Sequence, residues 1–424
     1  MRFKVFKNTV LLVLFILISC GNKVKQDASN SEHNNHTSNL LTNRLQDDKS
    51  IVVGANRTAA YLPLLKDKKV ALVANQTSVI FKKNFNSNNP NKHYTHLVDS
   101  LLALNIDIKK VFSPEHGFRG TADAGESVND GKDSKTGLPI LSLHGTHKKP
   151  TPKQLEDIDI LIFDIQDVGV RFYTYISTLH YVMEACAELS IPLLILDRPN
   201  PNGSYIDGPV LEKEYSSFLG MHPVPLVHGM TIGEYAKMIN GESWLPNNLK
   251  CDLTIVKMEN YNHNSSYSLP IRPSPNLPND QSILLYPSLG LFEGTNINAG
   301  RGTEFQFQRY GAPFLNKTHY NFSYTPVANF GAKYPKHQNT ICYGVNLADL
   351  KMERKFTLKF VIDAYNNAED KSKVFNTSNF TKHAGTEELQ EQIVAGLSEN
   401  DIKETWSNDL VNYRNMRDQY VIYD

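Results

Sequence analysis

The 424-residue sequence is 40% hydrophobic, 10% aromatic and 21% charged, which is typical of a globular protein rather than a disordered or fibrous one. Its formal net charge is zero, whereas nucleic acids are bound through a clustered excess of Lys and Arg, so no nucleic-acid partner is expected. The length exceeds what one hydrophobic core usually supports and favours two domains after an N-terminal extension.

The first segment of the chain has the layout of a secretory signal peptide. Basic residues precede an apolar run over 9–18, which is too short to span a bilayer as a mature helix. The run ends at Ser19 and Cys20, and this ending resembles the lipobox of bacterial lipoproteins, in which the cysteine is acylated. The alternative is an ordinary signal peptide that happens to contain a cysteine. We expect a lipoprotein signal peptide over 1–20 and a membrane anchor at Cys20 on a periplasm-facing protein of the cell envelope.

Residues 21–50 are rich in Asn, Ser, Lys and Asp and contain few large apolar side chains. Such a segment buries too little surface to fold, so we interpret it as a flexible tether. The remaining cysteines are Cys186, Cys251 and Cys342. They lack the spacing of a metal site and allow at most one disulfide.

The residues that follow alternate short apolar runs with helical periodicity, a pattern that predicts βαβ units and a parallel sheet with helices on both faces. We assign this Rossmann-like α/β domain to residues 51–206. The predicted strands are 70–74, 108–112, 138–143, 158–165 and 191–196, and the predicted helices are 95–104, 151–157 and 175–189.

The second half, residues 207–424, changes character because prolines interrupt shorter elements. We expect a second, mixed α+β domain there. Its predicted elements are a helix over 231–240, a strand over 253–258 and helices over 356–366 and 386–397.

Polar side chains follow four of the predicted strands of the first domain. In open α/β sheets ligands bind in the crevice beyond the carboxyl ends of the strands. We therefore expect these side chains to converge on one pocket. They are Asn75 and Gln76, then Glu115 and His116, then Asp164, Gln166 and Asp167, and finally Asp197 and Arg198.

The glycine-rich loop over 115–126 combines carboxylates with an imidazole. Hydrolysis of a glycosidic bond usually requires two carboxyl groups, one of which protonates the leaving oxygen. Glu115, directly after a buried strand, is the candidate general acid, and Asp123 or Glu126 the candidate partner. The alternative is that Glu115 pairs locally with Arg119 while Asp123 caps a turn.

His116 is also a candidate member of this site. A single Glu-His pair lacks the second histidine motif of a metal site, so we expect no metal and favour a hydrogen-bonding or proton-relay role. No cofactor is expected.

The segment 164–175 couples two acids, an arginine and aromatic side chains such as Tyr173, a make-up typical of a carbohydrate pocket. Arg171 or Arg198 could hold a substrate carboxylate through paired hydrogen bonds. The alternative is that Asp164 caps the next element and Arg171 pairs with Asp167.

A second glycine-rich loop, over 293–303, lacks the sequence of a phosphate-binding loop. We expect it to face the first domain across a cleft and to contribute Glu293, Asn296 or Arg301 to substrate binding. The alternative is a surface turn without a ligand.

Taken together, these motifs resemble the NamZ-type exo-β-N-acetylmuramidases. The matching segments are 112–120, 163–175, 196–203, 293–297 and 300–303, and the resemblance extends from residue 70 to the C-terminus. It implies release of N-acetylmuramic acid from the non-reducing end of peptidoglycan fragments, at a site in the cleft between a Rossmann-like domain and a second domain. It also implies Glu115 as the general acid, and the lactyl carboxylate of the sugar gives the arginines a chemical role.

The predicted site therefore has two groups of residues. The catalytic candidates are Glu115, Glu126, Asp123 and His116, and the candidates for substrate binding are Asn75, Gln76, Arg119, Asp164, Gln166, Asp167, Arg171, Tyr173, Asp197, Arg198, Glu293, Asn296 and Arg301. Two other functions remain open: a non-catalytic lipoprotein that binds muropeptides or sugars, and a metal-dependent amidase or esterase that uses His116 with Asp164 or Asp167.

Overall fold

The computed structural model describes residues 50–82, 93–120 and 129–424. The predicted signal peptide, the lipidation site Cys20 and nearly all of the tether lie outside these residues, as do Asp123 and Glu126. Within the described ranges, no helix has the length and apolar character needed to cross a membrane.

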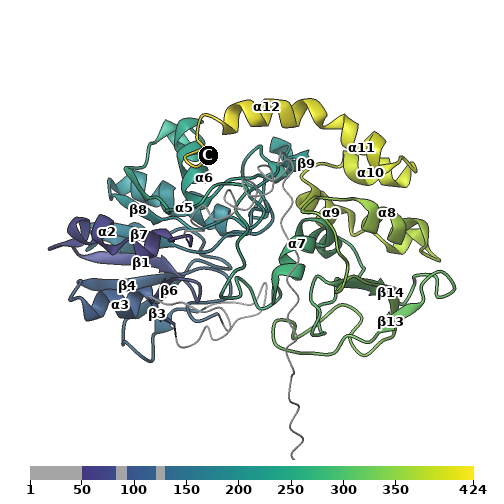
Figure 1. The fold of residues 1–424 in the computed structure, drawn as a ribbon, viewed down its shortest axis with the longest axis horizontal. Helices are drawn as coiled ribbons and strands as arrows, with labels where there is room; N and C mark the ends of the chain where they lie inside the picture. The colour runs from purple at the N-terminus through teal and green to yellow at the C-terminus, as the bar shows by residue number, and fades with distance from the viewer. Residues whose placement is uncertain (1–49, 83–92, 121–128) are drawn as a thin grey trace, which may run out of the picture. The chain divides into compact units, whose positions relative to one another are not determined.

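A seven-stranded sheet forms the first half of the fold (Figure 1). Its order is β11-β8-β7-β1-β4-β6-β5, and all neighbours are parallel except the edge pair β5 and β6. Without β5, this is the strand order of Rossmann-type doubly wound sheets. The chain adds strands on one side of β1 and then on the other, so the topological switch point lies between the parallel strands β1 and β7. The strands are β1 (Val70–Ala74), β4 (Ile108–Ser113), β5 (Gly131–Lys132), β6 (Pro139–Ser142), β7 (Ile160–Asp164), β8 (Leu193–Leu196) and β11 (Leu253–Val256).

Helices cover both faces of this sheet, and the central strands are buried on both sides as a parallel sheet requires. Leu72 of β1 packs into one hydrophobic cluster with α2 and α3, while its neighbour Val73 packs into another with α5 and α6. The prediction of a parallel sheet between two helical layers is confirmed. The helices are α2 (Thr58–Leu65), α3 (Leu97–Ala103), α4 (Pro152–Leu155), α5 (Tyr175–Leu189) and α6 (Ile232–Gly241).

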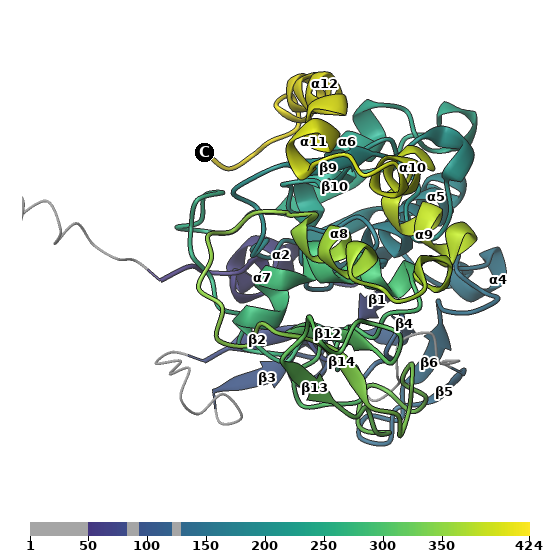
Figure 2. The same cartoon turned by 90° about the vertical axis from the view of Figure 1, so that its right-hand side faces the viewer.

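The second half contains a three-stranded antiparallel sheet in the order β12-β14-β13, and α8 lies beside it in both views (Figures 1 and 2). The mixed α+β character predicted for this half is confirmed. Its elements are β12 (Arg309–Ala312), β13 (Phe322–Tyr324), β14 (Cys342–Asn346), α7 (Asp280–Leu289), α8 (Lys359–Asn366), α9 (Thr377–Ala384), α10 (Glu388–Val394), α11 (Glu399–Thr405) and α12 (Ser407–Arg417).

Short elements connect the larger ones. Two antiparallel strand pairs are β2 (Val79–Phe81) with β3 (Tyr94–His96) and β9 (Asp207–Val210) with β10 (Pro225–Val227). The 3-10 helices are η1 (Gly54–Asn56), η3 (Lys213–Tyr215), η4 (Pro246–Asn248), η5 (Gly290–Gly294) and η6 (Lys371–Lys373).

Two elements differ in an instructive way from what the sequence pattern predicts. The helix expected from residue 95 begins at Leu97, because Tyr94–His96 pairs with β2 as a strand and His96 caps the helix. The strand expected in the second domain, β11, instead pairs in parallel with β8 at the edge of the large sheet. A strand's own sequence does not specify which sheet edge it joins.

The C-terminal segment returns to the first sheet. Figure 1 shows α12 running from α11 back toward α6. Beyond α12, the Tyr423 hydroxyl donates to Oδ2 of Asp197, at the end of β8, over 2.7 Å. Tyr413 of α12 donates to the His228 carbonyl over 2.7 Å. Contacts of this kind make residues 50–424 one compact unit.

Candidate active site

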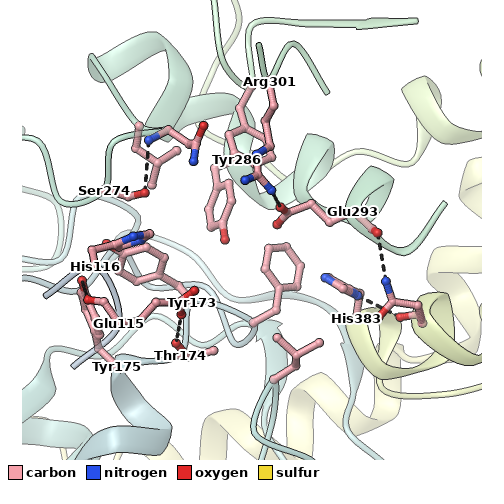
Figure 3. Close-up of a pocket in the computed structure, with 16 residues that line it drawn as sticks. Glu115, His116, Tyr173, Thr174, Tyr175, Ser274, Tyr286, Glu293, Arg301 and His383 are labelled. Atoms are coloured by element: carbon pink, nitrogen blue, oxygen red, sulfur yellow. Dashed lines mark hydrogen bonds and ion pairs between the residues drawn. The ribbon is translucent and has the colours of Figure 1, made fainter. Parts of the chain in front are cut away.

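A cavity of about 310 Å³ lies where strand ends of the parallel sheet meet η5 and α9 (Figure 3). Its lining includes two carboxylates, Glu115 from the first half and Glu293 from the second, and several aromatic rings. The lining residues are Glu115, His116, Phe172, Tyr173, Thr174, Tyr175, Leu219, Ser274, Asn276, Leu277, Tyr286, Glu293, Arg301, Phe307, Asn379 and His383.

Glu115 reaches the cavity because the chain turns directly after β4. The turn passes through His116, whose φ of 70° lies in the left-handed region that non-glycine residues seldom adopt. Such a conformation costs free energy in a non-glycine residue, and strained backbone is enriched at functional sites. As a result, two consecutive side chains, Glu115 and His116, both line the cavity.

The Glu115 carboxylate is held by the residues that follow β7. Thr174 donates its hydroxyl to Oε2 of Glu115 over 2.9 Å, and Tyr175 donates to the Glu115 carbonyl over 3.4 Å. Burial and then the negative charge of Glu115 raise the pKa of Tyr175, so its hydroxyl stays protonated. Thr174 precedes α5 but does not use its side chain to cap that helix, which leaves the hydroxyl to orient Glu115.

Aromatic rings form the walls between the two carboxylates. Tyr173 packs edge-on against Tyr175 and Tyr286, with ring centroids 4.8 and 6.0 Å apart. Its hydroxyl donates to the Pro273 carbonyl over 2.7 Å. Rings fixed in this way offer flat apolar faces on which the C–H surface of a sugar can pack.

Glu293 lies on the opposite side of the cavity from Glu115 (Figure 3). Arg301 pairs with it, with Nη1 3.1 Å from Oε1, and donates a second bond from Nη2 to the Gly331 carbonyl over 3.3 Å. The backbone of Glu293 is held as well, because Asn379 and Lys336 each donate to its carbonyl over 3.1 Å. The Glu293 carboxylate therefore has the positive charge of Arg301 beside it, and the Glu293 backbone is held by hydrogen bonds.

Lys336 fixes the turn that carries Glu293. The residue as a whole is exposed, but its ammonium group donates to the carbonyls of Phe292, Glu293 and Thr295. Desolvation of the ammonium group, which the charge of Glu293 only partly offsets, lowers the pKa of Lys336 to about 8.

Tyr286 stands between the two carboxylates. Its pKa is raised well above the ordinary value by burial, then by the charge of Glu293 and then by that of Glu115. Its hydroxyl is therefore within electrostatic reach of both carboxylates and remains a hydrogen-bond donor. His383 completes this side, and burial lowers its pKa, so its ring is neutral near pH 7.

Five of the predicted site residues line this cavity. They are Glu115, His116, Tyr173, Glu293 and Arg301. Sequence reasoning missed Thr174, Tyr286 and His383. Tyr286 and His383 belong to α7 and α9, where an aromatic side chain at helical spacing predicts core packing.

Asn75 and Gln76 support the walls rather than line the cavity. Asn75 donates from Nδ2 to the Tyr175 hydroxyl over 3.0 Å. Gln76 donates to the carbonyls of Arg272 and Pro273, each over 3.1 Å. The rule that ligands bind at the carboxyl ends of parallel strands therefore pointed to the correct edge of the sheet. At that edge, however, the amides of Asn75 and Gln76 bond to Tyr175 and to the carbonyls of residues 272–273.

Asp164 and Arg198 form a buried ion pair with each other. Nε of Arg198 lies 2.6 Å from Oδ1 of Asp164, and the two side chains are 3% and 0% exposed. Gln166 donates to the carbonyls of Asp167 and Pro199. Neither the ion pair nor the amide belongs to the cavity lining.

The placement of Arg171 corrects the expectation that it binds substrate or pairs with Asp167. Arg171 is fully buried, and its guanidinium donates to four backbone carbonyls, those of Pro209, Val224, His383 and Ala384. It fastens the loop after β7 to the end of α9. Asp167 accepts from the Gly169 amide and lies 3.6 Å from Nε2 of His228.

Three further candidates are engaged elsewhere. Arg119 forms a two-point ion pair with Asp133, at 3.2 and 2.8 Å. Asp197 is fully buried and accepts from Tyr423, Thr231 and the Gly233 amide, and burial raises its pKa to about 6. Asn296 donates to the Lys373 carbonyl.

The cavity offers no evident metal site. Over the described ranges, no group of three or more His, Cys, Asp or Glu side chains has the arrangement needed to hold a metal ion. His116 and Glu115 lie beside aromatic and hydroxyl groups, a donor set that suits a sugar better than a metal ion.

A Rossmann-like sheet joined to an α+β part, with two carboxylates facing each other across an aromatic cavity, defines a protein of the glycoside hydrolase type. Comparison with known proteins agrees. The family models described as "Exo-beta-N-acetylmuramidase NamZ", N-terminal and C-terminal, match residues 70–281 and 284–423. The chain belongs to this family.

Three relatives show how far the similarity extends. The chain is 40% identical over 383 residues to the peptidoglycan beta-N-acetylmuramidase NamZ of Bacillus subtilis, covering 86% of this chain and 89% of that protein. Two crystal structures of DUF1343 family proteins from Bacteroides fragilis are also similar. One is 44% identical with a TM-score of 0.79 and the other 28% identical with a TM-score of 0.73, and they cover 89% and 88% of this chain and 99% of their own.

Proposed function

We propose that this protein is an exo-acting glycoside hydrolase that releases N-acetylmuramic acid from the non-reducing end of peptidoglycan glycan fragments. Family membership and the curated relative support this function over most of the chain. The observation that carries the proposal is the presence of Glu115 and Glu293 on opposite sides of one aromatic cavity.

Glu115 is the general acid of this proposal. It donates its proton to the glycosidic oxygen as the bond from that oxygen to the anomeric carbon breaks. Thr174 holds the carboxyl group in place. Glu293, with Arg301 at its side, is the charged partner that faces the positive charge that develops on the sugar ring.

Arg301 is our candidate ligand of the lactyl carboxylate. Of the arginines singled out in the sequence, it is the one that lines the cavity. Arg171 and Arg198 are buried in other networks. A guanidinium at the cavity wall can bind a substrate carboxylate by donating directed hydrogen bonds to it.

The function is tested with two substrates that differ in whether the enzyme must protonate the leaving group. An N-acetylmuramyl-β-1,4-N-acetylglucosamine disaccharide has a poor leaving group, whereas an N-acetylmuramyl fluoride loses fluoride without protonation by the enzyme. Wild-type protein should cleave both. Glu115→Gln should lose most activity on the disaccharide and keep much more on the fluoride. Full activity of this variant on the disaccharide would place the acid elsewhere, and tight binding of the disaccharide without any turnover by the wild type would indicate a binding protein.

We also propose that the protein is anchored by lipid at Cys20 and faces the periplasm. The support is the basic and apolar sequence before Cys20 and the polar segment 21–50. Fractionation of cells that produce the wild type and Cys20→Ala tests it. The wild type should be recovered with membranes and incorporate labelled palmitate, and the variant should do neither. Equal behaviour of the two proteins would refute the anchor.

A further inference from the structure

The imidazole ring of His383, a buried residue near the end of α9, lines the cavity on the side away from Glu115 (Figure 3). Its Nδ1 lies 2.8 Å from the carbonyl oxygen of Asn379. A carbonyl oxygen can only accept a hydrogen bond, so Nδ1 carries the proton. Burial lowers the pKa of His383 and keeps the ring neutral near pH 7. The other nitrogen, Nε2, therefore has a lone pair and no proton.

Nε2 of His383 is a hydrogen-bond acceptor that faces the cavity. In Figure 3 it lies on the edge of the ring that points away from Asn379 and into the cavity. Of the residues that the structure describes, none bonds to Nε2, yet this atom is not sealed off from the cavity. A polar atom at a buried site costs free energy unless it has a partner, so Nε2 favours a ligand that offers a hydrogen-bond donor at this point.

Neighbouring residues fix the position of the His383 ring. Arg171, which does not line the cavity, donates to the His383 carbonyl over 3.2 Å and so holds the end of α9. Phe172 packs on the His383 ring with centroids 5.5 Å apart. Asn379 joins the ring to the carboxylate side of the site, because its side-chain amide donates to the Glu293 carbonyl over 3.1 Å. A fixed acceptor of this kind discriminates between ligand groups more sharply than a mobile one.

Protein interior lies behind His383. Arg171, Leu211 and Ala384 are all buried there. Their packing is close, because a β-carbon on Gly385 would lie 2.4 Å from Nη2 of Arg171 and 3.0 Å from Leu211. A sugar that reaches His383 therefore has no room to carry a further sugar in this direction.

The groups around the cavity orient N-acetylmuramic acid. Glu115, as the general acid, lies at C1, the carbon of the bond that breaks. In the sugar ring C4 lies across from C1 and next to C3, which carries the lactyl group. Arg301, our candidate ligand of the lactyl carboxylate, and His383 both lie across the cavity from Glu115 (Figure 3). A sugar with C1 at Glu115 thus turns C3 toward Arg301 and C4 toward His383.

We infer that Nε2 of His383 accepts a hydrogen bond from the C4 hydroxyl of the N-acetylmuramic acid that is released, and that this contact restricts the enzyme to the non-reducing end. The inference rests on the proposed function. Only the terminal sugar of a 1,4-linked glycan has a free C4 hydroxyl, because O4 of every other residue is in a glycosidic bond and has no hydrogen to donate. An internal sugar would leave Nε2 unpaired and would press its neighbour into the closed end, so hydrogen bonding and shape both select the chain end.

The test compares N-acetylmuramyl fluoride with its 4-deoxy counterpart in the wild type, His383→Phe and His383→Gln. The wild type should lose about tenfold to hundredfold in kcat/KM on the 4-deoxy compound, as expected when a buried polar group is left unpaired. His383→Phe lacks the acceptor, so it should lose a similar factor on the parent fluoride and little more on the 4-deoxy compound. His383→Gln is the matched control, because its amide oxygen can still accept, and it should keep part of the preference for the parent fluoride.

Two results would overturn the inference. One is a wild type that hydrolyses the two fluorides equally well, a comparison that does not depend on the folding of any variant. The other is a folded His383→Phe, checked by circular dichroism, that still loses the wild-type factor on the 4-deoxy compound, because the ring would then contact another part of the sugar or only support the wall. In both cases the wild-type rate on the parent fluoride would still support the proposed function. Failure of the wild type on the parent fluoride and on the disaccharide would refute the function itself.

Discussion

Replacing Thr174 with valine tests the role of Glu115 more sharply than removing Glu115 does. The change keeps the shape of the side chain and removes the hydroxyl that donates to Oε2 of Glu115 over 2.9 Å. It should disturb the fold little, because the Thr174 side chain does not cap α5. Only the stability of the charged carboxylate relative to its protonated form should change.

The size of the effect follows from the strength of that hydrogen bond. A hydrogen bond to a charged group contributes about 1.5 kcal/mol or somewhat more, and about 1.36 kcal/mol corresponds to one pH unit. The hydroxyl favours the charged form of Glu115, so its loss favours the protonated form. A general acid must be protonated to act, and kcat/KM on the disaccharide should therefore keep its plateau to higher pH, with the alkaline limb displaced upward by about one unit.

The measurement is the pH profile of kcat/KM for the wild type, Thr174→Val and Thr178→Val. Thr178 is buried one turn along α5 and does not line the cavity, so the control variant should reproduce the wild-type profile. A displaced acidic limb with a fixed alkaline limb would show that Glu115 acts in its charged form. An unchanged profile in Thr174→Val would refute the role of this hydrogen bond.

Three further predictions concern the carboxylate partner, its backbone and a buried acid. Glu293→Gln should lower kcat at least about 100-fold on both the disaccharide and the fluoride, because the Glu293 carboxylate acts at the sugar ring rather than on the leaving group. Steady-state rates on the two substrates check this prediction. Lys336→Met should lower kcat more than it raises KM, because the turn that carries Glu293 loses three carbonyl contacts, and Lys336→Arg should restore part of the loss. Burial raises the pKa of Asp197 to about 6, so the folded state binds this proton more tightly than the unfolded state does, and stability should fall by about 2 kcal/mol as pH rises from 4 to 6. Urea unfolding of Asp197→Asn across this range should lack that slope, and a parallel slope in both proteins would contradict the assignment.

The local pattern of the sequence determined most of the first sheet. Helix α5 has the predicted bounds, Tyr175–Leu189, and β1 has the predicted bounds Val70–Ala74. These elements are encoded by residues close in sequence, through the period of their apolar side chains. The same pattern placed Glu115 at the carboxyl end of a parallel strand, and so at the edge of the sheet where ligands bind.

Only the tertiary structure decided which polar residues reach the cavity. Arg171 and Arg301 are both arginines in polar, glycine-containing segments, but one is sealed among four backbone carbonyls and the other lines the site. Glu293 faces Glu115 because η5 packs against α9 and the Lys336 ammonium group, contacts between segments that are distant in the chain. Periodicity reports which face of an element is buried, but it carries no information about which distant element covers that face. The amino-acid sequence thus named both Glu115 and Glu293 as site residues, but it assigned Asp123 or Glu126 as the partner of Glu115. Only the packing of the second half against the first places Glu293 across the cavity from Glu115.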